Sequence, residues 1–211
     1  MAEMIKYIGL ALLMAVFPLQ GCATMDKEEC LTADWRQIGF EDGLKGYAPD
    51  RVAQHRKACA EHGITPDVPA YTQGRVTGLA QYCTPAKGFS LGHSGHPYSD
   101  VCSLLPDQET AFHQGFLTGR DIFLLEKEIS DRETSVRRLQ KELSSLEARL
   151  REKERELNQN CSKTGSCQAA LNLIRDLDRE IRITEDQIRR ERRVIAALSN
   201  TLRDQKAASP Y

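Results

Sequence analysis

Apolar residues recur at alternating spacings of three and four through the C-terminal part of the chain. They occupy the a and d positions of one heptad frame in two arms, a pattern typical of coiled coils. Arg132 and Lys153 take d positions in the first arm, and Thr184 and Glu191 do so in the second. The apolar a and d residues are Ile122, Leu125, Ile129, Val136, Leu139, Leu143, Leu146, Leu150 and Leu157, then Ile174, Leu177, Ile181, Ile188, Ile195, Leu198 and Leu202.

The gap between the arms, residues 158–167, contains Asn, Ser and Gly, which end helices. Cys161 and Cys167 bracket it, so a disulfide between them would close the turn of an antiparallel hairpin. The predicted arms, residues 122–157 and 168–204, would each be about 54 Å long. The flanks of the first arm are mostly acidic and the arginines of the second fall at outer positions, so pairing between chains stays open beside pairing within one chain.

Residues 32–119 differ in composition, being rich in Gly, Pro, Cys and aromatic residues, and predict a small helical domain. A weak repeat of GxxxG motifs runs through it, each with an aromatic residue upstream and an Asp start signal: Asp34, Asp67 and Asp107. Two glycines one turn apart allow a second helix to approach closely, so the motifs predict internal helix packing. A further helix is expected from Asp50 to a stop at Gly63. The three motifs are Gly39–Gly43, Gly74–Gly78 and Gly115–Gly119.

The stretch between Cys83 and Cys102 contains further glycines and lacks the order of a phosphate-binding loop, so it predicts a long turn-rich loop. Its segment from Gly88 to Tyr98 is a candidate site for a small ligand or cell-wall fragment. The candidate ligand-binding residues are Tyr71, Arg75, Tyr82, His93 and Tyr98.

The N-terminus has the features of an export signal. Lys6 precedes a run of apolar residues that is too short to span a bilayer as a helix, and small residues follow. Leu19, Gly21 and Cys22 resemble the lipobox of bacterial lipoproteins, which implies cleavage before Cys22 and acylation of that cysteine with chains such as palmitate. Residues 1–21 are then a signal peptide and residues 22–31 an anchor and linker. By the same resemblance, Ala23 favours the outer membrane. An ordinary secreted protein and an uncleaved anchor are the alternatives.

The chain has seven cysteines, so one has no partner in an oxidising compartment. Lipidation of Cys22 would leave an even set of six. Beside the pair in the hairpin turn, Cys30, Cys59, Cys83 and Cys102 allow three pairings, among which we choose Cys30–Cys59 and Cys83–Cys102.

A net charge of −1 excludes a strongly basic nucleic-acid binder. No catalytic motif is present, so we expect no enzyme, no catalytic residue and no cofactor. His93 and His96, with Asp100 nearby, are the histidine pair at ligand spacing, but three or four supported ligands are the rule, so no metal is expected.

The region from Cys30 to Ile122 resembles the YfiL-type family of small bacterial lipoproteins, which carry a domain of unknown function. The resemblance implies an envelope location and a helical fold, and no activity. It rests on Cys30, Asp34, Trp35, Gly39, Asp42, Gly43, His55, Cys59, Pro66, Asp67, Tyr71, Gly74, Arg75, Gly78, Leu79, Tyr82, Cys83, Gly88, Gly92, Gly95, Tyr98, Val101 and Cys102.

Together these patterns predict an all-α protein with a small disulfide-stapled helical head and a long antiparallel helical hairpin at residues 120–206. A short disordered tail, residues 207–211, would follow. The expected function is that of a non-enzymatic envelope lipoprotein that faces the periplasm. It would scaffold an unknown envelope protein, because an apolar helical surface can bind another helix. Binding of a small ligand through the Gly88–Tyr98 loop is the alternative.

Overall fold

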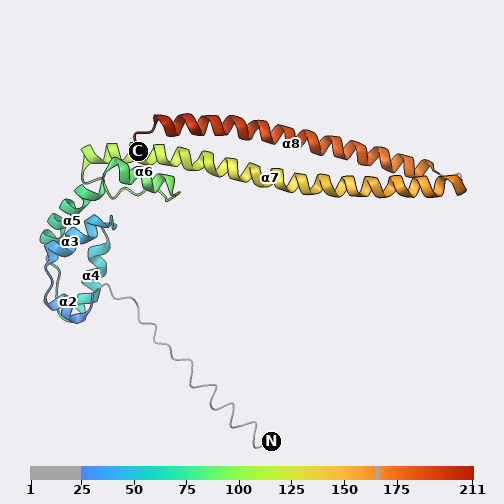
Figure 1. Cartoon of the computed structure of the whole chain (residues 1–211). Helices are drawn as coiled ribbons and strands as arrows, with labels where there is room; N and C mark the ends of the chain where they lie inside the picture. The colour runs from blue at the N-terminus through green and yellow to red at the C-terminus, as the bar shows by residue number, and fades with distance from the viewer. Residues whose placement is uncertain (1–24, 165–166) are drawn as a thin grey trace, which may run out of the picture. The chain divides into compact units, whose positions relative to one another are not determined.

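The computed structural model describes residues 25–164 and 167–211, and side chains for all of these except residues 160–164. Its described part is helical and contains no strand (Figure 1). It divides into two compact units, one of residues 25–84 and 100–109 and the other of residues 85–99 and 110–211. The helices are α2 (Lys27–Leu31), α3 (Trp35–Leu44), α4 (Arg51–Ala60), α5 (Val68–Tyr82), α6 (Pro85–His93), α7 (Pro106–Thr164) and α8 (Gln168–Ala208).

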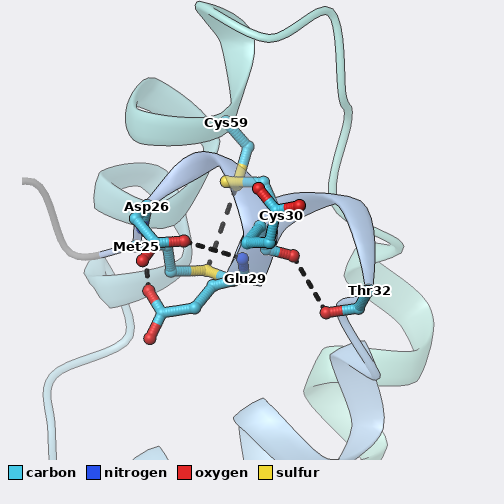
Figure 2. Close-up of a disulfide and its surroundings, with 7 residues drawn as sticks. Met25, Asp26, Glu29, Cys30, Thr32 and Cys59 are labelled. Carbon is cyan, nitrogen blue, oxygen red and sulfur yellow. Dashed lines mark hydrogen bonds between the residues drawn. A yellow bond between two sulfur atoms is a disulfide. The ribbon is translucent and has the colours of Figure 1, made fainter.

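Helix α2 begins at a capping box that was not predicted from the sequence. The Asp26 carboxylate accepts a hydrogen bond from the Glu29 amide at 2.8 Å, and the Glu29 carboxylate accepts one from the Asp26 amide at 2.7 Å (Figure 2). The Met25 side chain lies against the Cys30–Cys59 disulfide, with 4.0 Å between its sulfur and that of Cys59. Residues 27–31, expected to be part of a linker, are therefore a packed helical turn.

In the first unit, α3 and α5 cross at their glycines. A Cβ atom added to Gly39 would overlap the carbonyl oxygen of Tyr71, and one added to Gly78 would overlap that of Phe40. Asp34 and Asp67 start these helices by accepting hydrogen bonds from backbone amides in the first turn, as expected. The predicted close packing of the GxxxG motifs is confirmed here.

In the second unit, α6 and α7 cross in the same way. Gly88 and Gly92 lie against the α7 backbone at Phe112 and Phe116, and Gly115 and Gly119 lie against Pro85 and Phe89 of α6. The prediction that this stretch is one long loop is therefore wrong for residues 85–93. Their glycines form a fourth GxxxG motif and give α6 its contact with α7.

The two crossings are copies of one pattern. In each, the first helix carries glycines at matching positions and is followed by a glycine with positive φ, Gly46 (67°) or Gly95 (73°). A Cβ added to Gly46 would overlap the ring of Tyr82, and one added to Gly95 would overlap the ring of Phe123. Each ring lies four residues after the last glycine of the second helix in its pair. The chain thus contains the helix-pair motif twice.

Helices α7 and α8 form the antiparallel hairpin (Figure 1). Every a and d position predicted for the arms, including Arg132, Lys153, Thr184 and Glu191, is buried or half-buried. Val136, Leu139 and Ile188 form a buried cluster within it, against which Leu143 and Ile195 pack.

The ends of the hairpin differ from those predicted. Helix α7 starts at Pro106 and runs on to Thr164, so the gap at residues 158–167 is mostly helical and the expected boundary at residue 120 lies inside one helix. The tail predicted to be disordered is helical to Ala208, and the ring of Tyr211 packs 5.3 Å from that of Phe89. Aromatic packing orders this end.

Candidate functional site

A buried polar cluster lies in the first unit, where α3, α4 and α5 meet. Asp42 of α3 accepts two hydrogen bonds on the same oxygen, Oδ2, from Nε2 of His55 in α4 and from the hydroxyl of Tyr71 in α5, each at 2.8 Å. The exposed fractions of Asp42, His55 and Tyr71 are 5%, 3% and 1%. A buried carboxylate of this kind requires such partners, because its desolvation is otherwise costly.

The ionisation of the cluster follows from these bonds. Burial by itself would raise the pKa of Asp42, but the hydrogen bonds from His55 and Tyr71 and the nearby positive charge of Arg51 lower it below its usual value. Burial, together with the hydrogen bond to Asp42, raises the pKa of Tyr71 far above its usual value. Asp42 therefore stays charged and Tyr71 stays a hydrogen-bond donor near neutral pH.

Cationic side chains gather around Tyr47 in the loop after α3. The Arg51 guanidinium lies 4.7 Å from the centre of the Tyr47 ring, and Nη2 of Arg75 donates to the Tyr47 carbonyl oxygen at 2.9 Å. Arg75 is 3% exposed, whereas Arg51 is half-buried and is also held by Gln54, to which its Nη1 donates at 2.8 Å.

A cleft of about 420 Å³ opens beside this cluster, within the first unit. Asp42, His55, Tyr47 and Arg51 contribute to its wall, so both a buried carboxylate and a guanidinium border the same space. Its volume lies within the range of ordinary small-molecule sites, roughly 300–1,000 Å³. The remaining lining residues are Met25, Glu29, Thr32, Ala33, Asp34, Gln37, Ile38, Glu41 and Lys45.

The five residues predicted to bind a ligand do not form one site in either unit. Tyr71, Arg75 and Tyr82 belong to the first unit, and His93 and Tyr98 belong to the second. Tyr71 and Arg75 are buried in the polar cluster, and burial raises the pKa of Tyr82, whose ring lies against Gly46. Asp42 and Arg51, which border the cleft, were not among the predicted site residues, because single charged residues on helices carry no motif.

In the second unit, His93 and Tyr98 serve two different sets of contacts. Nε2 of His93 lies 3.0 Å from a carboxylate oxygen of Glu126 in α7, whose other oxygen is 2.6 Å from Nζ of Lys206 in α8. The hydrogen bond from Lys206 is the largest effect on the pKa of Glu126, which is lowered. The Tyr98 ring packs on His113 and Phe116, at 4.7 and 5.1 Å between ring centres.

The predicted pairing of Cys30, Cys59, Cys83 and Cys102 is confirmed. Cys30 bonds to Cys59 and Cys83 bonds to Cys102. Each bond joins the segment before the first helix of a glycine-packed pair to the segment before the second helix. Cys167 is also in a disulfide. The side chain of Cys161, its predicted partner, lies outside the described residues, and so does the whole of Cys22.

No helix among the described residues is both long enough and apolar enough to cross a bilayer. Comparison with curated proteins and with solved structures gave no match. One family model matches, described as "Protein of unknown function (DUF2799)", over residues 34–121. The match begins at the N-cap of α3 and ends just after Gly119, so it covers both glycine crossings and stops before the paired arms. Residues 34–121 of this chain are thus a DUF2799 domain.

Proposed function

We propose that this protein is a non-enzymatic lipoprotein of the bacterial envelope, of the YfiL type, with its DUF2799 domain at the membrane. Acyl chains on Cys22 would anchor it, preferentially in the outer membrane, and the chain would face the periplasm. The α7–α8 hairpin would then scaffold another envelope protein.

The disulfides support the location in this proposal. Both glycine-packed helix pairs are closed by a disulfide, and such bonds persist in the periplasm and are rare in the cytosol. With Cys22 lipidated, no cysteine of the mature chain is left over by count.

The observation that carries the scaffolding role is a set of three exposed apolar side chains on one face of α8, about 15 Å apart along the helix. Leu173, Ile183 and Val194 are 38%, 49% and 37% exposed. At 100° per residue they fall within a sector of roughly 80° around the helix. Large apolar side chains on one face of an exposed helix can serve as anchors for a partner helix or groove.

Photo-crosslinking in intact cells tests this role. A photoreactive amino acid placed at Ile183 should give a discrete adduct larger than the chain. The control position is Arg189, which is also exposed and lies roughly 120° around α8 from Ile183. Equal adducts at both positions, or no adduct at Ile183, would contradict a scaffolding role for this face.

A further inference from the structure

The cleft of the first unit is bordered by opposite charges that form no direct ion pair with Arg51 among the described residues. Among the described residues, no carboxylate lies within ion-pairing distance of the Arg51 guanidinium, although Asp34, Glu41 and Asp42 border the same cleft. Arg51 is held instead by Gln54 and the face of Tyr47. Its charge is positioned but not paired.

Within the part of the chain that the structure describes, only one of the two carboxylate oxygens of Asp42 accepts hydrogen bonds. Both of its hydrogen bonds end on Oδ2, so Oδ1 has no partner among the described residues. The side chain is 7% exposed and borders the cleft, so Oδ1 keeps contact with solvent and is open to a hydrogen-bond donor that enters the cleft.

Comparison of the two helix pairs indicates that the fold does not require these polar groups. Position 42 of the first pair corresponds to Leu91 of the second, and Tyr71 corresponds to Phe112. Arg75 likewise corresponds to Phe116. The second pair keeps the same glycine crossing with apolar side chains at these sites, so the polar set has a purpose beyond packing.

We propose that this cleft binds a small zwitterion, with its ammonium group on Oδ1 of Asp42 and its anionic group on Arg51. A simple cation would leave Arg51 without an ion-pair partner in a partly desolvated site, and a simple anion would leave Oδ1 of Asp42 without a partner. A zwitterion whose charges are a few bonds apart satisfies both. The lowered pKa of Asp42 keeps the carboxylate charged for this role.

Two kinds of molecule carry this chemistry: a free amino acid and the phosphoethanolamine headgroup of a lipid. Both present an ammonium group close to an anionic oxygen group. The cleft is near the start of the described chain, since Met25 borders it. The site is independent of the hairpin, so it goes beyond the scaffolding role.

Isothermal titration of the purified mature chain tests the proposal with five probes: glycine, phosphoethanolamine, ethanolamine, acetate and inorganic phosphate. At least one of the two zwitterions should bind at least tenfold more tightly than each probe that carries a single charged group. Preference for phosphoethanolamine would assign the lipid headgroup as the source, and preference for glycine would assign the amino acid.

Substitutions in α4 connect the binding to the cleft. Arg51→Gln should weaken the zwitterion at least tenfold, while Arg51→Lys, which keeps the charge, should retain most of the affinity. Arg56→Gln is the matched control, because Arg56 is exposed on the same helix and does not border the cleft. Thermal unfolding confirms that each variant is folded. No binding of either zwitterion, binding no tighter than that of the single-charge probes, or an Arg51→Gln affinity equal to wild type would overturn the proposal.

Discussion

Glycine positions decide the packing of the DUF2799 domain at the scale of single residues. The GxxxG spacing predicted close helix contact correctly at Gly39 and Gly74. The same spacing at Gly88 and Gly92 was assigned to a loop, because Ser and further glycines nearby indicate turns. Tertiary contact with α7 outweighs that local preference, since the crossing requires a residue without a Cβ.

Gly39→Ala should destabilise the protein by about 1–3 kcal/mol, because the added methyl group overlaps the Tyr71 carbonyl and overpacked interfaces cost that much. The sign of the effect is informative. A solvated helical glycine gains up to about 1 kcal/mol when replaced by alanine. Urea unfolding measures the change, with the exposed Thr77→Ala as a control expected to be nearly neutral. A stabilised Gly39→Ala variant would contradict the crossing.

The Asp42 cluster makes stability depend on pH in the acid range. The folded pKa of Asp42 is lower than its ordinary value of 3.8, so the unfolded chain takes up the proton first. The stabilisation is complete above that value and is lost as the pH falls through the lower folded pKa. Unfolding free energies measured against pH should fall in this window for wild type and less for Asp42→Asn. The control is Asp50→Asn, which removes an exposed carboxylate that makes no capping hydrogen bond and should keep the wild-type profile. Identical profiles for all three proteins would refute the role of Asp42 in acid stability.

At the scale of elements, the heptad pattern predicted the hairpin interface well. Burial along a helix follows its period directly, and all the polar d positions are at the interface too. The sequence could not show which polar residues meet, because that depends on the register of the two arms. In the structure, Nη1 of Arg132 lies 2.9 Å from the Glu191 carboxylate, so two interruptions of the apolar pattern pair with each other.

The end of the first arm was predicted less well. Asn, Ser and Gly in residues 158–167 suggested an early stop, yet α7 continues to Thr164. A helix already formed by packing extends through residues of modest propensity, since each adds a backbone hydrogen bond.

Arg132→Glu should lower the melting temperature, because it places a negative charge beside both Glu128 and Glu191. Adding Glu191→Arg should recover part of the loss, with repulsion from Glu128 remaining. The matched comparison is Arg138→Glu, whose carboxylate neighbour, Glu142, is on its own helix. A double-mutant cycle should give coupling for the 132–191 pair and none for the 138–191 pair. Equal coupling in both cycles would mean that the register is different.

For the whole molecule, composition located the change from glycine-rich to glycine-poor sequence but not the division into units. The expected boundary at residue 120 lies within α7, because that helix begins in the DUF2799 domain and its glycines pack against α6. The disulfide pairing chosen for Cys30, Cys59, Cys83 and Cys102, in contrast, is confirmed by the two described bonds. The polar cleft was not predictable, because it requires knowing which helices meet.

The central claim, that this is a lipid-anchored protein of an oxidising compartment, is tested most directly by the intact mass of the protein extracted from membranes. We expect a chain that starts at Cys22, carries acyl groups on that residue, and has lost six thiol hydrogens in three disulfides. The Cys22→Ala variant should show no acyl mass and should leave the membrane fraction. A wild-type chain that still carries residues 1–21, that has an unmodified Cys22, or that alkylates at the other cysteines without reduction would contradict the account.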